Sequence, residues 1–154
     1  MKRPKTAIFM VLLIAALCRP ASSDDKTNLL LESIGHFSSQ SVYLTYIAIG
    51  TVSDGHAKQV YSKETADELL GKLVGLCSAA VGQLNKLLSS GAMAGEDIQF
   101  TSKLIDTFNL LSAQAASYRN FTRTGDTSHI KIFTEKRQEA WKNIKSLLGI
   151  QEEG

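Results

Sequence analysis

The stretch EDIQFTSKLIDTFNLLSAQAASYRNFTR, residues 96–123, shows most clearly how this chain folds. Apolar or small side chains recur every three or four residues along it, which is the period of an amphipathic helix and not of a strand. Glu96 and Asp97 open the segment, where acidic groups suit the positive end of the helix dipole. The expected buried face consists of Ile98, Thr101, Leu104, Ile105, Phe108, Leu111, Ala115 and Tyr118.

The same period predicts three more helices, over about residues 26–52, 63–88 and 128–148. Gly91 follows the second of these and Gly149 follows the last, and glycine is the residue that most often ends a helix. Four helices of similar length joined by short links favour antiparallel neighbours. We therefore expect an all-α fold, an up-down-up-down antiparallel four-helix bundle.

The buried faces of these three helices are predicted from the apolar stripes that they carry. The first helix presents Leu30, Ile34, Phe37, Ser41, Leu44 and Ala48, with Leu31, Val42 and Ile49 beside them. The second presents Leu69, Leu73, Leu76, Ala80, Leu84 and Leu87, with Leu70, Val74, Cys77 and Val81 beside them. The fourth presents Ile130, Phe133, Ala140, Trp141, Ile144, Leu147 and Leu148. Gly71, Gly75 and Gly82 are interpreted as small residues that let the second helix approach a neighbour closely.

The first residues of the chain have the form of a signal peptide. Lys2, Arg3 and Lys5 precede the apolar run Thr6–Cys18, which is shorter than the roughly twenty residues that a membrane-spanning helix needs. Small side chains before Asp24 predict cleavage there. We therefore expect a signal peptide over residues 1–23, a single domain over residues 24–154, export to the periplasm or the extracellular space, and no stable membrane span after cleavage.

Cleavage changes the charge and the cysteine count of the protein. The leader holds four of the 17 basic residues and no acidic one, so 13 basic residues remain against 15 acidic ones and the net charge becomes −2. A nucleic-acid partner is therefore not expected. Cys77 becomes the only cysteine, so no intrachain disulfide can form. A lipoprotein acylated at Cys18 is the alternative, although Leu17 is larger than the residue that such processing prefers.

The motifs of common enzyme classes are absent from the sequence. Glu32 and His36 lie one turn apart, but a carboxylate-bridged metal bundle needs a second such pair. No Cys-x-x-Cys-His haem motif, Gly-x-Ser-x-Gly elbow or phosphate-binding loop occurs. Cys77 lies in an apolar stripe, where a thiol has a raised pKa and is inert. We expect no metal, no cofactor and no catalytic residue.

One group of polar residues remains, and the expected topology brings it together. The link between the first two helices and the link between the last two lie at the same end of an up-down-up-down bundle. Arginine and lysine near helix termini bind carboxylates and phosphates, whereas acids and tyrosines at the same places also serve as helix caps and lids on a core. The candidate ligand or partner site at this end consists of His56, Tyr61, Tyr118, Arg119, Arg123, Asp126 and His129.

These observations give one leading hypothesis of function and two rivals. The leading one is an exported, non-enzymatic helical bundle that binds an unknown protein, an envelope component or a small ligand through its surface or its end. The first rival is a ligand or cofactor carrier with a site between helices. The second is a hydrolase-type enzyme that uses His56 or His129 as acid or base.

Overall fold

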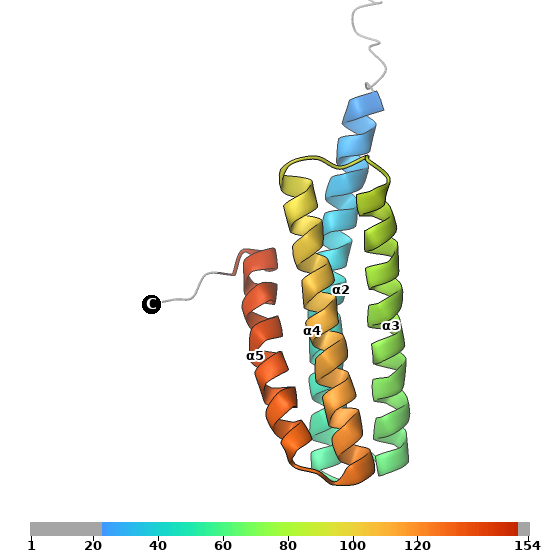
Figure 1. The fold of residues 1–154 in the computed structure, drawn as a ribbon, viewed down its shortest axis with the longest axis vertical. Coiled ribbons are helices and arrows are strands. Elements are labelled where there is room, and N and C mark those ends of the chain that lie inside the picture. Colours follow the sequence, from blue (N-terminus) through green and yellow to red (C-terminus); the bar gives the residue numbers. More distant parts are fainter. Residues whose placement is uncertain (1–22, 151–154) are drawn as a thin grey trace, which may run out of the picture. The chain divides into compact units, whose positions relative to one another are not determined.

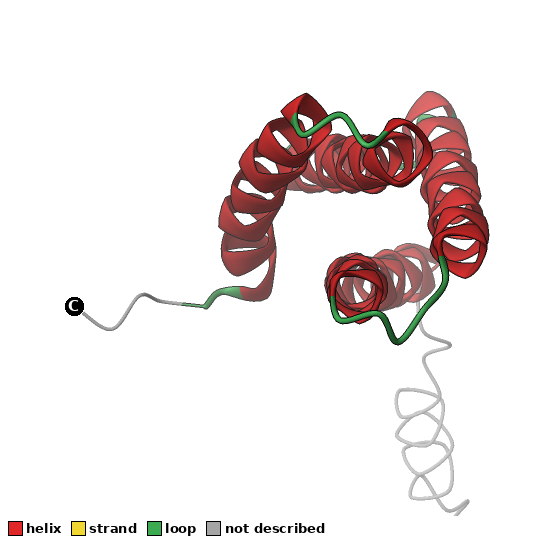
Figure 2. Ribbon diagram, turned by 90° about the horizontal axis from the view of Figure 1, so that it is seen from below, coloured by secondary structure: helices red, strands yellow, loops and turns green. Residues whose placement is uncertain are grey.

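The computed structural model describes residues 23–150, which form four α-helices (Figure 1). Within these residues the protein is all-α and no residue belongs to a strand, as Figure 2 also shows from below. Apart from Ser23, the signal peptide predicted over residues 1–23 lies outside the described residues. The helices are α2 (Ser23–Ala57), α3 (Lys63–Ser89), α4 (Glu96–Thr124) and α5 (Ser128–Leu148).

The bounds of α3, α4 and α5 agree with the predicted ones to within a residue, but those of α2 do not. Helix α2 begins three residues earlier than predicted and ends five residues later, at Ala57. Gly50 and Gly55 remain helical, so neither of them ends it. Two residues after the helix ends, Gln59 has a left-handed φ of 59°, and the amide of Val60 donates to the carbonyl of Gly55.

Helix α3 begins at a side-chain cap, and α4 and α5 end at glycines. The hydroxyl of Ser62 accepts a hydrogen bond from the amide of Thr65 at 3.1 Å, so Ser62 is the N-cap of α3. Gly125 and Gly149 end α4 and α5 with φ values of 75° and 65°, a conformation that glycine adopts without the strain of a side chain. A serine cap therefore accounts for the start of α3, and left-handed glycines account for the ends of α4 and α5.

The chain divides into two units, residues 1–34 and residues 35–154. The described part of the first unit is the N-terminal part of α2, in which Leu29 and Leu30 are exposed. In the second unit α3 packs against α4, and α4 packs against α5. All contacts described below belong to this second unit.

Long-range contacts identify which helix ends lie together. Lys63, the first residue of α3, donates from Nζ to the carbonyl of Arg123 near the end of α4, at 3.2 Å. Lys103 of α4 donates to the hydroxyl of Ser146 of α5. Helix α3 therefore begins where α4 ends, and the early part of α4 lies beside the late part of α5.

The core is centred on α4, and its predicted face is largely confirmed. Leu104, Phe108, Leu111, Ala115 and Tyr118 are all buried, and only Ile98 at the start of the helix is exposed. Helix α5 contributes the predicted residues Phe133, Ala140 and Ile144. The buried apolar residues contributed by α2 and α3 are Val42, Ile49, Val52, Ala66, Leu70, Cys77 and Leu84.

The predicted main stripe of α2 is wrong. Phe37 is 70% exposed and Leu44 is 64% exposed, whereas Val42 and Ile49 are fully buried. No charged residue occurs between Phe37 and Ser53, so the sequence carries two apolar stripes and no polar face that would mark the solvent side. In α3 the face is rotated in the same way, and the predicted core residue Leu76 is 64% exposed.

Two of the three glycines of α3 do not have the role that the sequence suggested, whereas Gly71 does lie close to a side chain of α4. A side chain at Gly75 or Gly82 would meet no atom within 4 Å, so these two glycines serve no close helix contact among the described residues. Cys77, in contrast, is confirmed as a core residue, only 1% exposed. Burial raises the pKa of its thiol to about 11.

One polar side chain in the core was not predicted. Gln114 of α4 is fully buried, and neither its Nε2 nor its Oε1 atom has a hydrogen-bond partner among the described residues. The neighbouring buried hydroxyls are bonded within the helix, since Thr107 donates to Lys103 and Ser117 to Ala113. Gln114 is therefore the polar group at which burial is not compensated.

Candidate functional site

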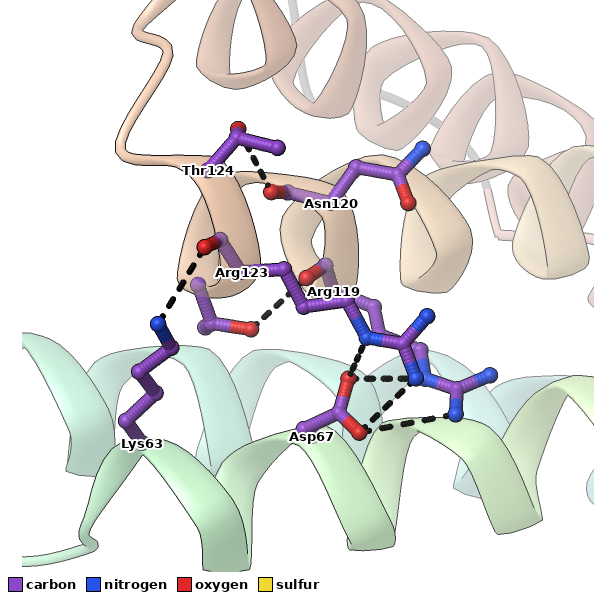
Figure 3. Close-up of polar contacts among 7 residues, drawn as sticks. Lys63, Asp67, Arg119, Asn120, Arg123 and Thr124 are labelled. Atoms are coloured by element: carbon purple, nitrogen blue, oxygen red, sulfur yellow. Dashed lines mark hydrogen bonds and ion pairs between the residues drawn. The ribbon is translucent and has the colours of Figure 1, made fainter.

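Two arginines of α4 converge on one carboxylate of α3 (Figure 3). Arg119 donates from Nε to Oδ1 of Asp67 at 2.9 Å and from Nη2 to Oδ2 at 3.5 Å. Arg123, one helical turn later, donates from Nε to Oδ1 at 2.5 Å and from Nη2 to Oδ2 at 3.0 Å. Both guanidinium groups therefore approach the carboxylate with the same edge, in the bidentate geometry that arginine favours.

This cluster lies at the surface and is electrostatically coupled. The side chains of Asp67, Arg119 and Arg123 are 25%, 30% and 49% exposed. Hydrogen bonds from Arg123 and then from Arg119 lower the pKa of Asp67 to about 2, and the carboxylate in turn raises the pKa of Arg123. Asp67 is therefore ionised at any physiological pH, and it holds the two guanidinium groups side by side.

Two further residues of α3 shape the cluster. Lys63 lies one turn before Asp67 and adds a third cation, bonded to the carbonyl of Arg123 (Figure 3). At Gly71 a Cβ atom would lie 3.0 Å from Cζ of Arg119, so the absence of a side chain leaves the space that this guanidinium occupies. We call Lys63, Asp67, Arg119 and Arg123 the arginine cluster.

The arginine cluster contains three cations and one carboxylate, so it carries an excess of positive charge: Arg119 and Arg123 are paired with Asp67, whereas Lys63 is bonded to the carbonyl of Arg123. The nearby acids of α3 make their main contacts with groups other than the two arginines. Glu68 is paired with Lys72 at 2.6 Å. A backbone hydrogen bond and then one with Ser62 lower the pKa of Glu64 at the start of the helix, and the charge of Lys63 makes a smaller contribution. The cluster is thus suited to receive an additional carboxylate or phosphate from outside.

His56 and Tyr118 form a second, separate group. The hydroxyl of Tyr118 donates to the carbonyl of Ser53 at 2.9 Å and lies 3.3 Å from Nδ1 of His56. Because its single proton is used on Ser53, this hydroxyl accepts from a protonated Nδ1 of His56. Burial, and then the charge of Asp54, raise the pKa of Tyr118. This tyrosine is a buried cross-link between α2 and α4.

The remaining predicted site residues have local structural contacts. The ring of Tyr61 lies over Gly55, where a Cβ atom would be only 2.5 Å from Cδ2 of the ring. Asp126 accepts from the amide of Ser128 at 2.8 Å, which caps the start of α5 and, with a smaller contribution from nearby His129, lowers the pKa of Asp126. His129 lies in the first turn of α5 and is half-buried.

The structure thus brings together four of the seven predicted site residues, in two pairs and not in one group. Arg119 and Arg123 face α3, and His56 and Tyr118 join α2 to α4. Sequence reasoning missed Asp67 and Lys63, which belong to the arginine cluster. Asp67 lies 52 residues from Arg119 along the chain, so no local pattern signals their pairing.

A hollow of about 330 Å³ between α2, α3 and α4 is one place, among the described residues, that the carrier hypothesis could use. Its lining offers no acidic, basic or metal-binding side chain, and consists of Ser41, Leu44, Thr45, Leu76, Ala80 and Phe108. Within residues 23–150 no group of histidine, cysteine and acidic side chains is arranged to hold a metal ion. None of the helices described has the length and apolarity needed to cross a membrane.

Comparisons with known proteins give no relative for this chain. No protein-family model matches it, and neither a curated protein nor a solved structure matches it.

Proposed function

We propose that this protein is an exported, non-enzymatic bundle of up-down-up-down topology that binds an acidic partner through the arginine cluster. The proposed export rests on the basic and apolar leader that ends before Asp24. The proposed partner is a protein segment rich in carboxylates. Its side chains would reach the guanidinium edges that Asp67 leaves free.

One observation carries this proposal: two guanidinium groups are held side by side, at the surface, by a single carboxylate. Each arginine uses its Nε and Nη2 atoms on Asp67, so the Nη1 donors remain for a ligand. Asp67 fixes the orientation of long side chains that would otherwise lose rotamer freedom on binding. A prepared pair of donors with excess positive charge fits a carboxylate better than two free arginines do.

The non-enzymatic part of the proposal is supported by the protonation states of the groups concerned. Asp67, with a pKa of about 2, is too weak a base to take up protons near neutral pH. The thiol of Cys77, with a pKa of about 11, remains protonated there. The His56 ring is bonded to the buried hydroxyl of Tyr118, which limits its use as an acid or base.

The up-down-up-down topology is supported by contacts between distant residues. Lys63 and Arg123 place the start of α3 beside the end of α4. A Cβ atom at Gly35 would lie 3.3 Å from Phe100, which places early parts of α2 and α4 together, and His56 and Tyr118 do the same for their late parts. Such contacts are those of parallel α2 and α4 and antiparallel α3 and α4.

The test is a calorimetric titration of the protein, without its leader, with a hexaglutamate peptide at low salt. We expect saturable binding that weakens as salt rises, because exposed charges are screened. The double variant Arg119→Gln/Arg123→Gln should bind at least tenfold more weakly while circular dichroism shows the same helicity.

The matched control is Lys86→Gln/Lys142→Gln, which removes the same charge from exposed positions of α3 and α5. It should bind as the unmodified protein does. Equal losses in both double variants would mean that net charge, and not the arginine cluster, governs binding, and the proposal would then be wrong. Absence of any binding by the unmodified protein would also overturn it.

A further inference from the structure

Arg137 of α5 lies in an unusual setting between α2 and α5. Its Nε donates to the hydroxyl of Tyr46 at 3.3 Å, and its guanidinium lies 5.4 Å from the Tyr46 ring centre and 6.0 Å from that of Phe133. A Cβ atom at Gly50 would be 3.3 Å from Nη2, so this buried glycine provides the space for the guanidinium. The charge is thus half-buried among rings and backbone.

No carboxylate is paired with Arg137 among the residues that the structure describes. On α5 itself the positions one turn away are Phe133, Thr134, Ala140 and Trp141, and none of them is acidic. The facing part of α2, from Phe37 to Ser53, has no charged residue at all. This differs from Arg119 and Arg123, which share Asp67. A half-buried cation with no counter-charge is costly unless a ligand supplies one.

Aromatic rings continue from Arg137 along the same face. The Tyr46 ring is stacked on Trp141, with centres 5.4 Å apart and planes 25° apart. Tyr43, which is 37% exposed, follows with its ring 6.4 Å from that of Trp141. Flat apolar groups stack well on such rings, whose edges and faces carry opposite partial charge.

We propose that this face, formed by Tyr43, Tyr46, Arg137 and Trp141, binds a small organic acid with one carboxylate and a flat, apolar body. The carboxylate accepts from the Nη donors of Arg137, which have no hydrogen-bond partner among the described residues, and the body lies against Tyr43 and Trp141. One guanidinium matches one negative charge. A phosphate dianion would call for further cations, which the contacts of this face do not include.

Benzoate is the simplest probe with these two features, and benzamide is its neutral counterpart of the same shape. Trp141 is the only tryptophan of the chain, so its single indole N–H resonance reports on this face alone. We expect benzoate to shift this resonance in a saturable way, and benzamide and inorganic phosphate to bind at least tenfold more weakly. Arg137→Gln should weaken benzoate binding at least tenfold, since a charge-assisted hydrogen-bond pair is lost.

Lys142→Gln is the matched control, because it removes one exposed charge next to Trp141 and leaves Arg137 in place. It should bind benzoate unchanged. Arg137→Lys keeps the positive charge but replaces the planar guanidinium, which can donate two parallel hydrogen bonds, by an ammonium group, so we expect an intermediate affinity for benzoate. If Arg137→Gln does not fold, the affinity of Arg137→Lys tests the role of Arg137.

Three outcomes would overturn the inference: no saturable benzoate shift in the unmodified protein, equal binding of benzamide or phosphate, or full benzoate affinity in the Arg137 variants. This site is independent of the arginine cluster. If benzoate does not bind, the proposal that the arginine cluster binds hexaglutamate still stands. If hexaglutamate does not bind, the proposal for benzoate still stands.

Discussion

Replacing Gly71 and Gly75 by alanine, one at a time, would measure what the contact between Arg119 and Asp67 contributes to stability. Both glycines lie within α3, where glycine is about 1 kcal/mol less favourable than alanine. A Cβ atom at Gly75 meets nothing within 4 Å, so Gly75→Ala should stabilise the protein by about 1 kcal/mol.

At Gly71 the same gain is opposed by a clash. The new Cβ atom would lie 3.0 Å from Cζ and 3.2 Å from Nη2 of Arg119, so the guanidinium must move away from Asp67. An ion pair that is 25–30% exposed contributes about 0.5 to 1 kcal/mol. Gly71→Ala should therefore change the free energy of unfolding by about zero.

Urea denaturation followed by circular dichroism measures both changes, and a third variant completes the comparison. In the Arg119→Gln background the pair is already lost, so Gly71→Ala should regain about 1 kcal/mol. If Gly71→Ala stabilised the unmodified protein as much as Gly75→Ala does, the reasoning would be refuted. Either the new Cβ atom would not displace Arg119, or the loss of its ion pair with Asp67 would cost nothing.

Four other outcomes are expected. Acid titration should remove about 1 kcal/mol of stability between pH 4 and pH 2 from the unmodified protein but not from Asp67→Asn, since the folded pKa of about 2 lies below the unfolded value of 3.8 and screening reduces the effect; equal acid profiles would contradict this. Tyr118→Phe should lose about 1 kcal/mol in denaturant titrations because the bond to Ser53 is removed, and an unchanged midpoint would show that the bond has no net value. Cys77 should react with a thiol reagent only as fast as the protein opens, and rapid labelling of the folded protein would mean that the thiol is accessible. Trp141→Ala should lower stability by about 2 kcal/mol, roughly half of the loss at a fully buried ring, and a melting shift near zero would place the ring in solvent.

Sequence reasoning identified the four helices, and it identified the buried face only where polar residues mark the opposite side. In α4 the buried Leu104, Leu111 and Tyr118 are separated from polar positions such as Asn109, so one face stands out. In α2 the stripes through Phe37 and through Val42 are equally free of charge. Only the position of the neighbouring helices decides between them, and the sequence of α2 does not contain that information.

The candidate sites were predictable to different degrees. The arginines of the arginine cluster were expected at the end of the bundle, but their partner depends on the packing of α3 against α4. Arg137 was missed because a lone arginine on an amphipathic helix resembles an ordinary surface residue. Its signal was present in the sequence: it lies between Phe133 and Trp141, with no acid one turn away on either side.

The buried amide of Gln114 lowers the stability of the protein, and a substitution at this position could recover what is lost. A buried polar group without a partner costs about 1 to 3 kcal/mol, a considerable part of the net stability of a domain of this size. An apolar side chain of similar volume, such as methionine, would remove that penalty without opening a cavity. Gln114 is therefore a natural first position for engineering a more robust version of this scaffold.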